Sequence, residues 1–163
     1  MIDPLTGIFN RRGYRERIDQ LIGRERRIFS LVVLDIDHFK GINDSYGHKT
    51  GDRLIQKIVA FTNKIIRNED FFARYGGDEF IIVLVGLDRT KAVDVAEKIR
   101  IRISQTSFQL QRNVEKFIDI SLSMGVAEAR PDDTAQSVFD RADKALYLAK
   151  ERGRNRVCSD VDL

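Results

Sequence analysis

The hydrophobic positions of this chain fall into uninterrupted runs and into stripes at helical spacing. The runs over residues 28–34, 71–73 and 80–85 lack a helical period, which favours strands, the first buried on both faces of a sheet. Stripes with a period near 3.6 residues predict four longer helices. They are expected over about residues 10–25, from Thr50 or Gly51 to Ile66, from Asp88 to Ile103, and from Thr134 to Gly153.

The remaining segments complete an α/β pattern. A short helix closed by Gly47 is expected over residues 38–48, and a last short strand over 155–158. Between them, residues 108–129 predict a second antiparallel pair whose longer strand spans 117–127 after a polar turn at 111–113. We therefore predict an α/β fold with a mostly antiparallel central sheet of about five strands, covered by helices, and an additional small β-hairpin.

An acidic turn separates the runs at 71–73 and 80–85, which indicates a β-hairpin with Asp78 and Glu79 near its tip. Because glycine adopts positive φ angles without strain, we expect Gly76 and Gly77 to form a tight turn. Carboxylates beside an open backbone suit a metal and a phosphate. On this stretch alone, an ordinary glycine turn with solvated acids is an equally good interpretation.

Two further acids, Asp35 and Asp37, end the buried run at 28–34. Buried carboxylates are costly unless they are paired, hydrogen-bonded or bound to a metal. Alternation places both on one face, and antiparallel pairing would bring them beside the hairpin tip. Such an oxygen-only cluster favours Mg²⁺ or Mn²⁺ over zinc. Lys40 and the basic segment 150–154 could neutralise the phosphates of a nucleoside triphosphate.

Composition narrows the class of protein. The 163 residues, 42% hydrophobic and 33% charged, fit a single globular domain spanning residues 1–163. No apolar run approaches the ~20 residues of a membrane span, and no signal segment is visible. We expect a cytoplasmic location, or the cytosolic part of a larger membrane-attached protein. The net charge of +3 gives no indication of nucleic-acid binding, and the lone Cys158 cannot form an internal disulfide.

Four motifs in order resemble the GGDEF domain of the diguanylate cyclase family over almost the whole chain. They are DPLTGIFNRR at residues 3–12, DIDHFKGIND at 35–44, RYGGDEF at 74–80 and KERGRN at 150–155. The resemblance implies a palm or nucleotidyl-cyclase-like fold with a ferredoxin-like core. It also implies condensation of two GTP into cyclic di-GMP plus two pyrophosphate, by an antiparallel homodimer that uses Mg²⁺ or Mn²⁺, two per active site.

The resemblance implies a role for each matching position. Asp35, Asp78 and Glu79 would be the catalytic residues, and with the Ile36 carbonyl they would hold the metals. The residues implied to contact GTP are His38, Phe39, Lys40, Gly76, Gly77, Lys150 and Arg154 at the phosphates, and Asn43 and Asp52 at the guanine. Without the resemblance, Asp52 would be interpreted as an acid in the first turn of a helix, where its negative charge interacts favourably with the helix dipole.

Arg67 and Asp70 resemble the RxxD product-inhibition site of the family, with five residues between Asp70 and Gly76. The alternative is a solvated helix end. Lys98 stands where many members of the family have an arginine. Because lysine lacks the planar fork of arginine, this departure predicts weaker product binding.

The leading hypothesis from the sequence is an active, product-inhibited diguanylate cyclase. Its partners would be GTP, cyclic di-GMP and a second copy of the chain, with an N-terminal sensor or regulatory domain in the full-length protein. The alternative is a catalytically silent GGDEF domain that acts as a cyclic di-GMP or GTP receptor or scaffold. A polymerase-like palm is disfavoured by the small size and by the lack of a nucleic-acid-binding module.

Overall fold

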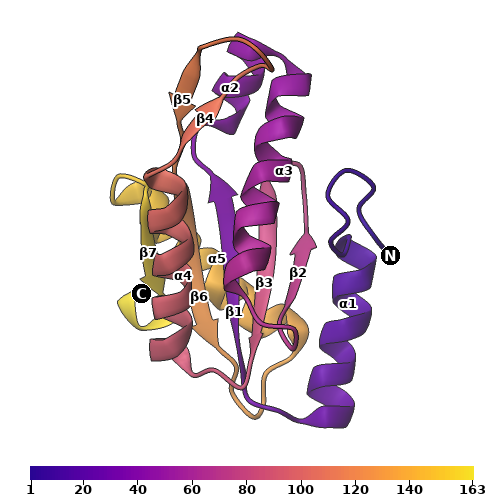
Figure 1. Ribbon diagram of the computed structural model, residues 1–163. Helices are drawn as coiled ribbons and strands as arrows, with labels where there is room; N and C mark the ends of the chain where they lie inside the picture. Colours follow the sequence, from indigo (N-terminus) through magenta and orange to yellow (C-terminus); the bar gives the residue numbers. More distant parts are fainter.

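A central sheet with helices on both faces forms the molecule, described over residues 1–163 by a computed structural model (Figure 1). Five strands lie in the order β2-β3-β1-β6-β7. Their bounds are β1 (Phe29–Ile36), β2 (Phe71–Arg74), β3 (Glu79–Val85), β6 (Leu122–Glu128) and β7 (Arg156–Ser159). All neighbours pair antiparallel except β6 and β7, which are parallel. The predicted, mostly antiparallel sheet is confirmed.

Helices cover both faces of this sheet. They are α1 (Arg11–Gln20), the π-helical η1 (Leu21–Glu25), α2 (Phe39–Tyr46), α3 (His48–Ile65), α4 (Arg89–Ser104), α5 (Ala135–Glu151) and the 3₁₀ turn η2 (Asp160–Asp162). Val32 and Leu34 of β1 pack in a core with α3 and α4, whereas Leu31 and Val33 pack in a second core with α1 and α5. Burial on both faces explains why apolar and polar residues do not alternate along this strand.

Most predicted helix ends match the structure. Gly47 ends α2 at a φ of 89°, and the side chains of Asp88 and Thr134 cap α4 and α5. Helix α3 begins at His48, slightly before the predicted start, and the predicted helix over 10–25 changes from α to π geometry at Leu21. No helix in the structure is both long enough and apolar enough to cross a membrane.

The predicted strand over residues 117–127 is wrong in one respect, because it divides between two sheets. Residues 117–119 form β5 (Phe117–Asp119), which pairs with β4 (Ser107–Gln109) in a separate two-stranded sheet. The central strand β6 begins only at Leu122. Phe117 is 55% exposed, whereas Leu122 is fully buried. A strand buried on both faces therefore cannot include the exposed residues that precede Leu122.

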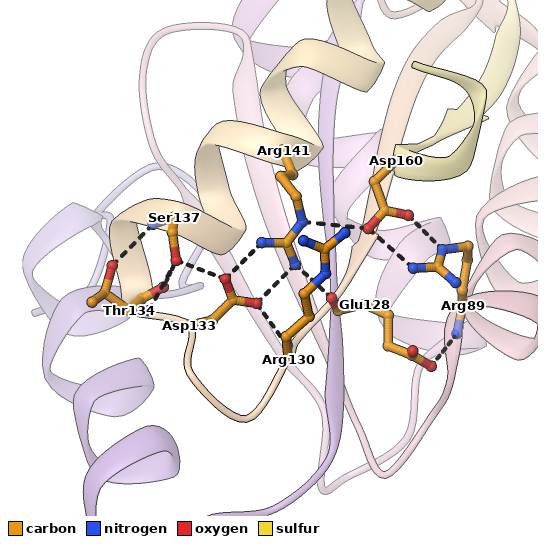
Figure 2. A network of polar contacts seen from close by, with 8 residues as sticks. All are labelled: Arg89, Glu128, Arg130, Asp133, Thr134, Ser137, Arg141 and Asp160. Carbon is orange, nitrogen blue, oxygen red and sulfur yellow. Dashed lines mark hydrogen bonds and ion pairs between the residues drawn. The ribbon is translucent and has the colours of Figure 1, made fainter.

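A polar network joins α4, β6, α5 and η2 (Figure 2). Asp160, whose side chain is 1% exposed, pairs with Arg89 and lies 3.5 Å from Arg141. The Arg141 guanidinium donates two hydrogen bonds of 2.6 and 2.8 Å to Asp133 and one of 2.7 Å to the Glu128 carbonyl. Bidentate pairs of this kind hold both partners in a defined geometry. The network therefore anchors the C-terminal turn to the two helices.

The charge of Asp133 makes this network sensitive to acid. Burial alone would raise the pKa of Asp133, but hydrogen bonds from Arg141, the Arg130 N–H and Ser137 lower it from 3.8 to about 2. The folded state therefore binds this proton less readily than the unfolded state. The resulting stabilisation is complete above pH 4 and is lost as the pH falls through about 2.

We expect Asp133→Asn to flatten this acid dependence. Urea unfolding between pH 7 and pH 2 should show that the wild-type protein loses more free energy of unfolding below pH 4 than the variant does. Asp132→Asn, at the neighbouring exposed residue, is the matched control and should follow the wild type. Parallel curves for the wild type and Asp133→Asn would contradict the prediction.

Candidate functional site

The hairpin between β2 and β3 places Asp78 and Glu79 at one end of the sheet. The N–H groups of Tyr75 and Gly76 both donate to the Glu79 carbonyl, at 2.9 and 3.2 Å. Neither Gly76 nor Gly77 has a positive φ, so the predicted left-handed glycine turn is wrong. Residues 75–78 form a longer connection, which closes without left-handed residues. Both glycines are exposed, which leaves this backbone open to a ligand.

Residues of the first sequence motif brace this hairpin. The Arg74 guanidinium donates to the Gly77 carbonyl at 2.8 and 3.1 Å, and one of its nitrogens lies 3.5 Å from Asp3. The Arg11 guanidinium lies over the Tyr75 ring, 4.3 Å from its centre, and donates to its hydroxyl at 3.0 Å. These contacts hold the tip of the hairpin against the N-terminal segment.

An acidic centre forms where β1 and β3 pair. The register sets Asp35 opposite Glu79, and the Ile36 N–H lies 3.4 Å from the Asp78 carbonyl. Lys150 of α5 donates to Oδ2 of Asp35, while Oδ1 of the same carboxylate is buried without a hydrogen-bond partner. Burial, opposed by Lys150, raises the pKa of Asp35. Burial and the Asp35 carboxylate raise the pKa of Glu79 to about 7.

This centre fits a divalent cation. Oδ1 of Asp35 has no hydrogen-bond partner, and burial, with the neighbouring carboxylates, raises the pKa of Asp35 and Glu79, so a bound cation would stabilise their charged forms. Oxygen donors from carboxylates and carbonyls are those that Mg²⁺ and Mn²⁺ prefer. No group of three or more His, Cys, Asp or Glu side chains is already arranged as a metal site. Lys150 currently supplies the positive charge at Asp35.

Asp37 does not belong to this centre, contrary to the expected acidic cluster. Its carboxylate accepts hydrogen bonds of 2.6 Å from the hydroxyls of Ser121 and Ser123. It also accepts one of 3.1 Å from the Asn155 N–H. Neighbouring hydroxyl and backbone donors therefore satisfy this buried carboxylate, and they leave it little capacity for a metal.

Helix α2 begins directly after the acidic centre. His38 precedes it at a φ of 58°, Phe39 is buried and Lys40 is exposed. The first N–H groups of a helix have no intrahelical partner, and they point away from the helix toward any anion placed there. The structure therefore brings these three expected phosphate contacts to the same end of the sheet as Asp35.

Asn43 and Asp52 lie on the packed pair of helices α2 and α3. Oδ1 of Asn43 is buried without a partner, and Asp52 is exposed. A Cβ on Gly51 would lie 1.9 Å from Oδ1 of Asn43, so only glycine permits this approach. Sequence reasoning treated Gly51 as part of a helix start and missed this role; its position next to Asp52 was the available signal.

The basic motif at the end of α5 approaches the acidic centre from the other side. Lys150 reaches Asp35, and Arg154 lies in the exposed turn after the helix. Three consecutive residues of this turn, Gly153, Arg154 and Asn155, have positive φ angles of 113°, 64° and 46°. The chain therefore reverses sharply between α5 and β7.

Arg67, Asp70 and Lys98 line a cavity of about 340 Å³. The Arg67 guanidinium donates to Asp70 at 2.9 and 3.1 Å and to the Val85 carbonyl at 2.6 Å. The structure thus brings together the three residues of the expected product site. Lys91 also lines this cavity and was missed by sequence reasoning. Its position seven residues before Lys98 on one helix was the available signal.

Comparisons with known proteins cover nearly the whole chain. The family model described as "Diguanylate cyclase, GGDEF domain" matches residues 1–156. Diguanylate cyclase DgcP of Pseudomonas aeruginosa is 38% identical over 160 residues, which are 96% of this chain and 23% of DgcP. Diguanylate cyclase DosC of Escherichia coli is 38% identical over 159 residues, which are 96% of this chain and 34% of DosC. The chain thus spans about a quarter to a third of these two relatives.

A solved structure shares the fold. The crystal structure of the GGDEF domain of DgcB from Caulobacter crescentus, in complex with c-di-GMP, matches with a TM-score of 0.92 and 35% identity. The match covers 98% of this chain and 95% of that chain. The observed fold is therefore that of a known protein family.

Proposed function

The chain belongs to the diguanylate cyclase GGDEF family, and on this premise we propose that it condenses two GTP into cyclic di-GMP with release of two pyrophosphates. The names of its relatives and the ligand of the DgcB structure support the proposal. The acidic centre supports it most directly. The β1–β3 register sets Asp35 opposite Glu79, and Lys150 donates a hydrogen bond to the Asp35 carboxylate.

Each residue of the acidic centre has a proposed role. Asp35, Asp78, Glu79 and the Ile36 carbonyl hold Mg²⁺ or Mn²⁺, two per active site, and Glu79 also helps to activate the ribose 3′-hydroxyl. The bound metals would lower the pKa of that hydroxyl and stabilise charge at the α-phosphate and the leaving pyrophosphate. The hydroxyl attacks the α-phosphorus of the other nucleotide, and a second identical step closes the ring.

The surrounding residues hold the substrate. Asn43 and Asp52 read the guanine edge, because an amide and a carboxylate together can donate to and accept from it. The proposed phosphate contacts are the start of α2 at His38, Phe39 and Lys40, the backbone of Gly76 and Gly77, and the side chains of Lys150 and Arg154. Lys150, which donates to Asp35, would be free to contact the phosphates if a cation were bound at that carboxylate.

One chain holds one GTP, so the reaction needs two chains that face each other in antiparallel fashion. Incubation with GTP and Mg²⁺ over a range of protein concentrations, with chromatographic analysis of products, tests the activity. We expect the rate per protein molecule to rise with concentration as the homodimer forms. Absence of cyclic di-GMP even from a forced dimer would contradict the proposal, and binding of GTP or cyclic di-GMP without turnover would favour a receptor.

We propose that the cavity at Arg67, Asp70 and Lys98 binds cyclic di-GMP and that the bound product inhibits the enzyme. Arg67→Ala removes the guanidinium while Asp70 keeps hydrogen bonds from the N–H groups of residue 67 and Val85, at 2.8 and 3.0 Å. The fold should therefore tolerate the change. We expect the final yield of cyclic di-GMP to rise at least about tenfold in chromatographic time courses, because a guanidinium bonded to the ligand contributes about 1.5–3 kcal/mol.

Two further variants sharpen this prediction. Glu69→Gln removes a carboxylate 2.7 Å from Arg67 that does not line the cavity, and it should keep normal inhibition. Lys98→Arg should strengthen inhibition, because a planar guanidinium can bond the ligand at two points. An Arg67→Ala enzyme that stops at the same product concentration as the wild type would refute the proposed site.

A further inference from the structure

The second aspartate of the Asp35-Ile36-Asp37 segment has no role in the proposed chemistry, yet it is 5% exposed and fully hydrogen-bonded. One of these bonds joins distant parts of the chain, because Oδ2 accepts it from the N–H of Asn155 at 3.1 Å. Asn155 directly follows Arg154, a proposed phosphate contact. Asp37 therefore connects the end of the central strand β1 to the turn that carries this arginine.

The turn after α5 needs such an anchor. Arg154 and Asn155 both have left-handed backbone conformations, with φ of 64° and 46°. A left-handed arginine is strained and persists only where the surroundings enforce that conformation. Arg100 of α4 supplies a second restraint, since its guanidinium donates to Oδ1 of Asn155 at 2.9 Å. Asp37 and Arg100 thus hold Asn155 from two sides.

From these contacts we propose that Asp37 is a positioning residue for triphosphate binding. Its carboxylate fixes the Gly153–Asn155 turn against the end of β1 and thereby directs Arg154 toward the phosphates. Asp37 itself touches neither the substrate nor the metals. This inference rests on the proposed function for the identity of the ligand, whereas the anchoring of Asn155 can be tested without it.

Ser121 and Ser123 explain why this carboxylate can serve as an anchor. Each hydroxyl donates to it at 2.6 Å, Ser121 to Oδ2 and Ser123 to Oδ1. Both serines flank the start of β6, and Ser123 pairs with Asp35 in the β1–β6 register. Asp37 is therefore held at the end of the central sheet, and the exposed turn gains a rigid point of attachment from it.

Two nucleotides separate a positioning role from a general loss of structure. We expect Asp37→Ala to lower the affinity for 3′-deoxy-GTP, which lacks the attacking hydroxyl, by about tenfold or more in calorimetric titrations. The affinity for guanosine monophosphate, which lacks the β- and γ-phosphates, should fall by less than about twofold. Equal weakening of both nucleotides, or of neither, would overturn the proposal.

Two variants complete the test. Asp37→Asn keeps an oxygen for the Asn155 N–H, and its amide can donate to the Ser123 hydroxyl, so triphosphate affinity should stay close to that of the wild type. Ser123→Ala removes the bond to Oδ1 but leaves the Ser121 and Asn155 bonds to Oδ2, so triphosphate affinity should fall much less than in Asp37→Ala. Affinity lost in Ser123→Ala as strongly as in Asp37→Ala would also overturn the proposal.

Hydrogen exchange reports on the anchor independently of any nucleotide. The Asn155 amide should be protected in the wild-type protein although the residue is exposed, and Asp37→Ala should accelerate its exchange by about tenfold or more. A wild-type protein that does not bind 3′-deoxy-GTP would contradict the proposed function. Hydrogen exchange would still test whether Asp37 holds Asn155 in place. An unprotected Asn155 amide in the wild type would refute the anchor, whether or not Asp37→Ala folds.

Discussion

Asp35→Asn should abolish cyclic di-GMP synthesis and leave the fold intact. The substitution removes a proposed metal ligand, and metal stabilisation of transition-state charge contributes several kcal/mol, or about three powers of ten in rate. Burial raises the pKa of Asp35, so the folded state disfavours the charge that asparagine removes. We therefore expect unchanged or slightly higher thermal stability together with a rate reduced by at least about a thousandfold.

Chromatographic product assays at saturating GTP and Mg²⁺ would measure this loss. Asp19→Asn, at an exposed residue of α1 away from the acidic centre, is a matched control and should keep full activity. Unchanged thermal stability would show that the Asp35→Asn protein is folded. Synthesis at more than a few per cent of the wild-type rate would show that Asp35 is not an essential metal ligand.

Gly125→Ala should strongly destabilise the folded protein. A Cβ at Gly125 of β6 would lie 2.1 Å from the Ala142 carbonyl and 2.3 Å from the Leu146 N–H of α5. These are backbone atoms, so the methyl group can be accommodated only if the helix moves away from the sheet. Overpacking of this kind costs about 1–3 kcal/mol and occasionally more, and we expect about 3 kcal/mol or greater.

Urea unfolding followed by circular dichroism would measure the change in free energy of unfolding. Gly41→Ala is the matched control, because no atom lies within 4 Å of a Cβ at that position. Gly41 lies inside α2, where alanine is intrinsically favoured by up to about 1 kcal/mol. That control should be neutral or stabilising. A Gly125→Ala protein with the wild-type denaturation midpoint would show that α5 does not lie against the backbone of β6.

The sequence was sufficient to predict much of the sheet, because burial leaves a direct trace in residue type. The run at 28–34, apolar except for Ser30 and without alternation, predicted a strand buried on both faces, and β1 lies in the middle of the sheet. Caps at Asp88 and Thr134 were predictable because helix ends need local hydrogen-bond acceptors. The turn at 76–77 was predicted wrongly, because glycine permits positive φ without requiring it.

The candidate site shows the same division. Residue types and their order along the chain indicated the acidic centre, the basic motif and the family. The different surroundings of Asp35 and Asp37 could not be predicted from the sequence, since alternation assigns both side chains to one face. Only the tertiary structure decided that Lys150 lies at one carboxylate while Ser121, Ser123 and Asn155 surround the other.

Local sequence by itself determined most of the elements, their buried faces and the chemical types available, because these depend on periodicity and on neighbouring residues. The tertiary structure decided which distant groups meet. Gly125 lies against Ala142 of α5, 17 residues further along the chain. The Asn155 N–H donates to Asp37, 118 residues away. Such contacts depend on how strands and helices pack in three dimensions, and that packing leaves no periodic signal in the chain.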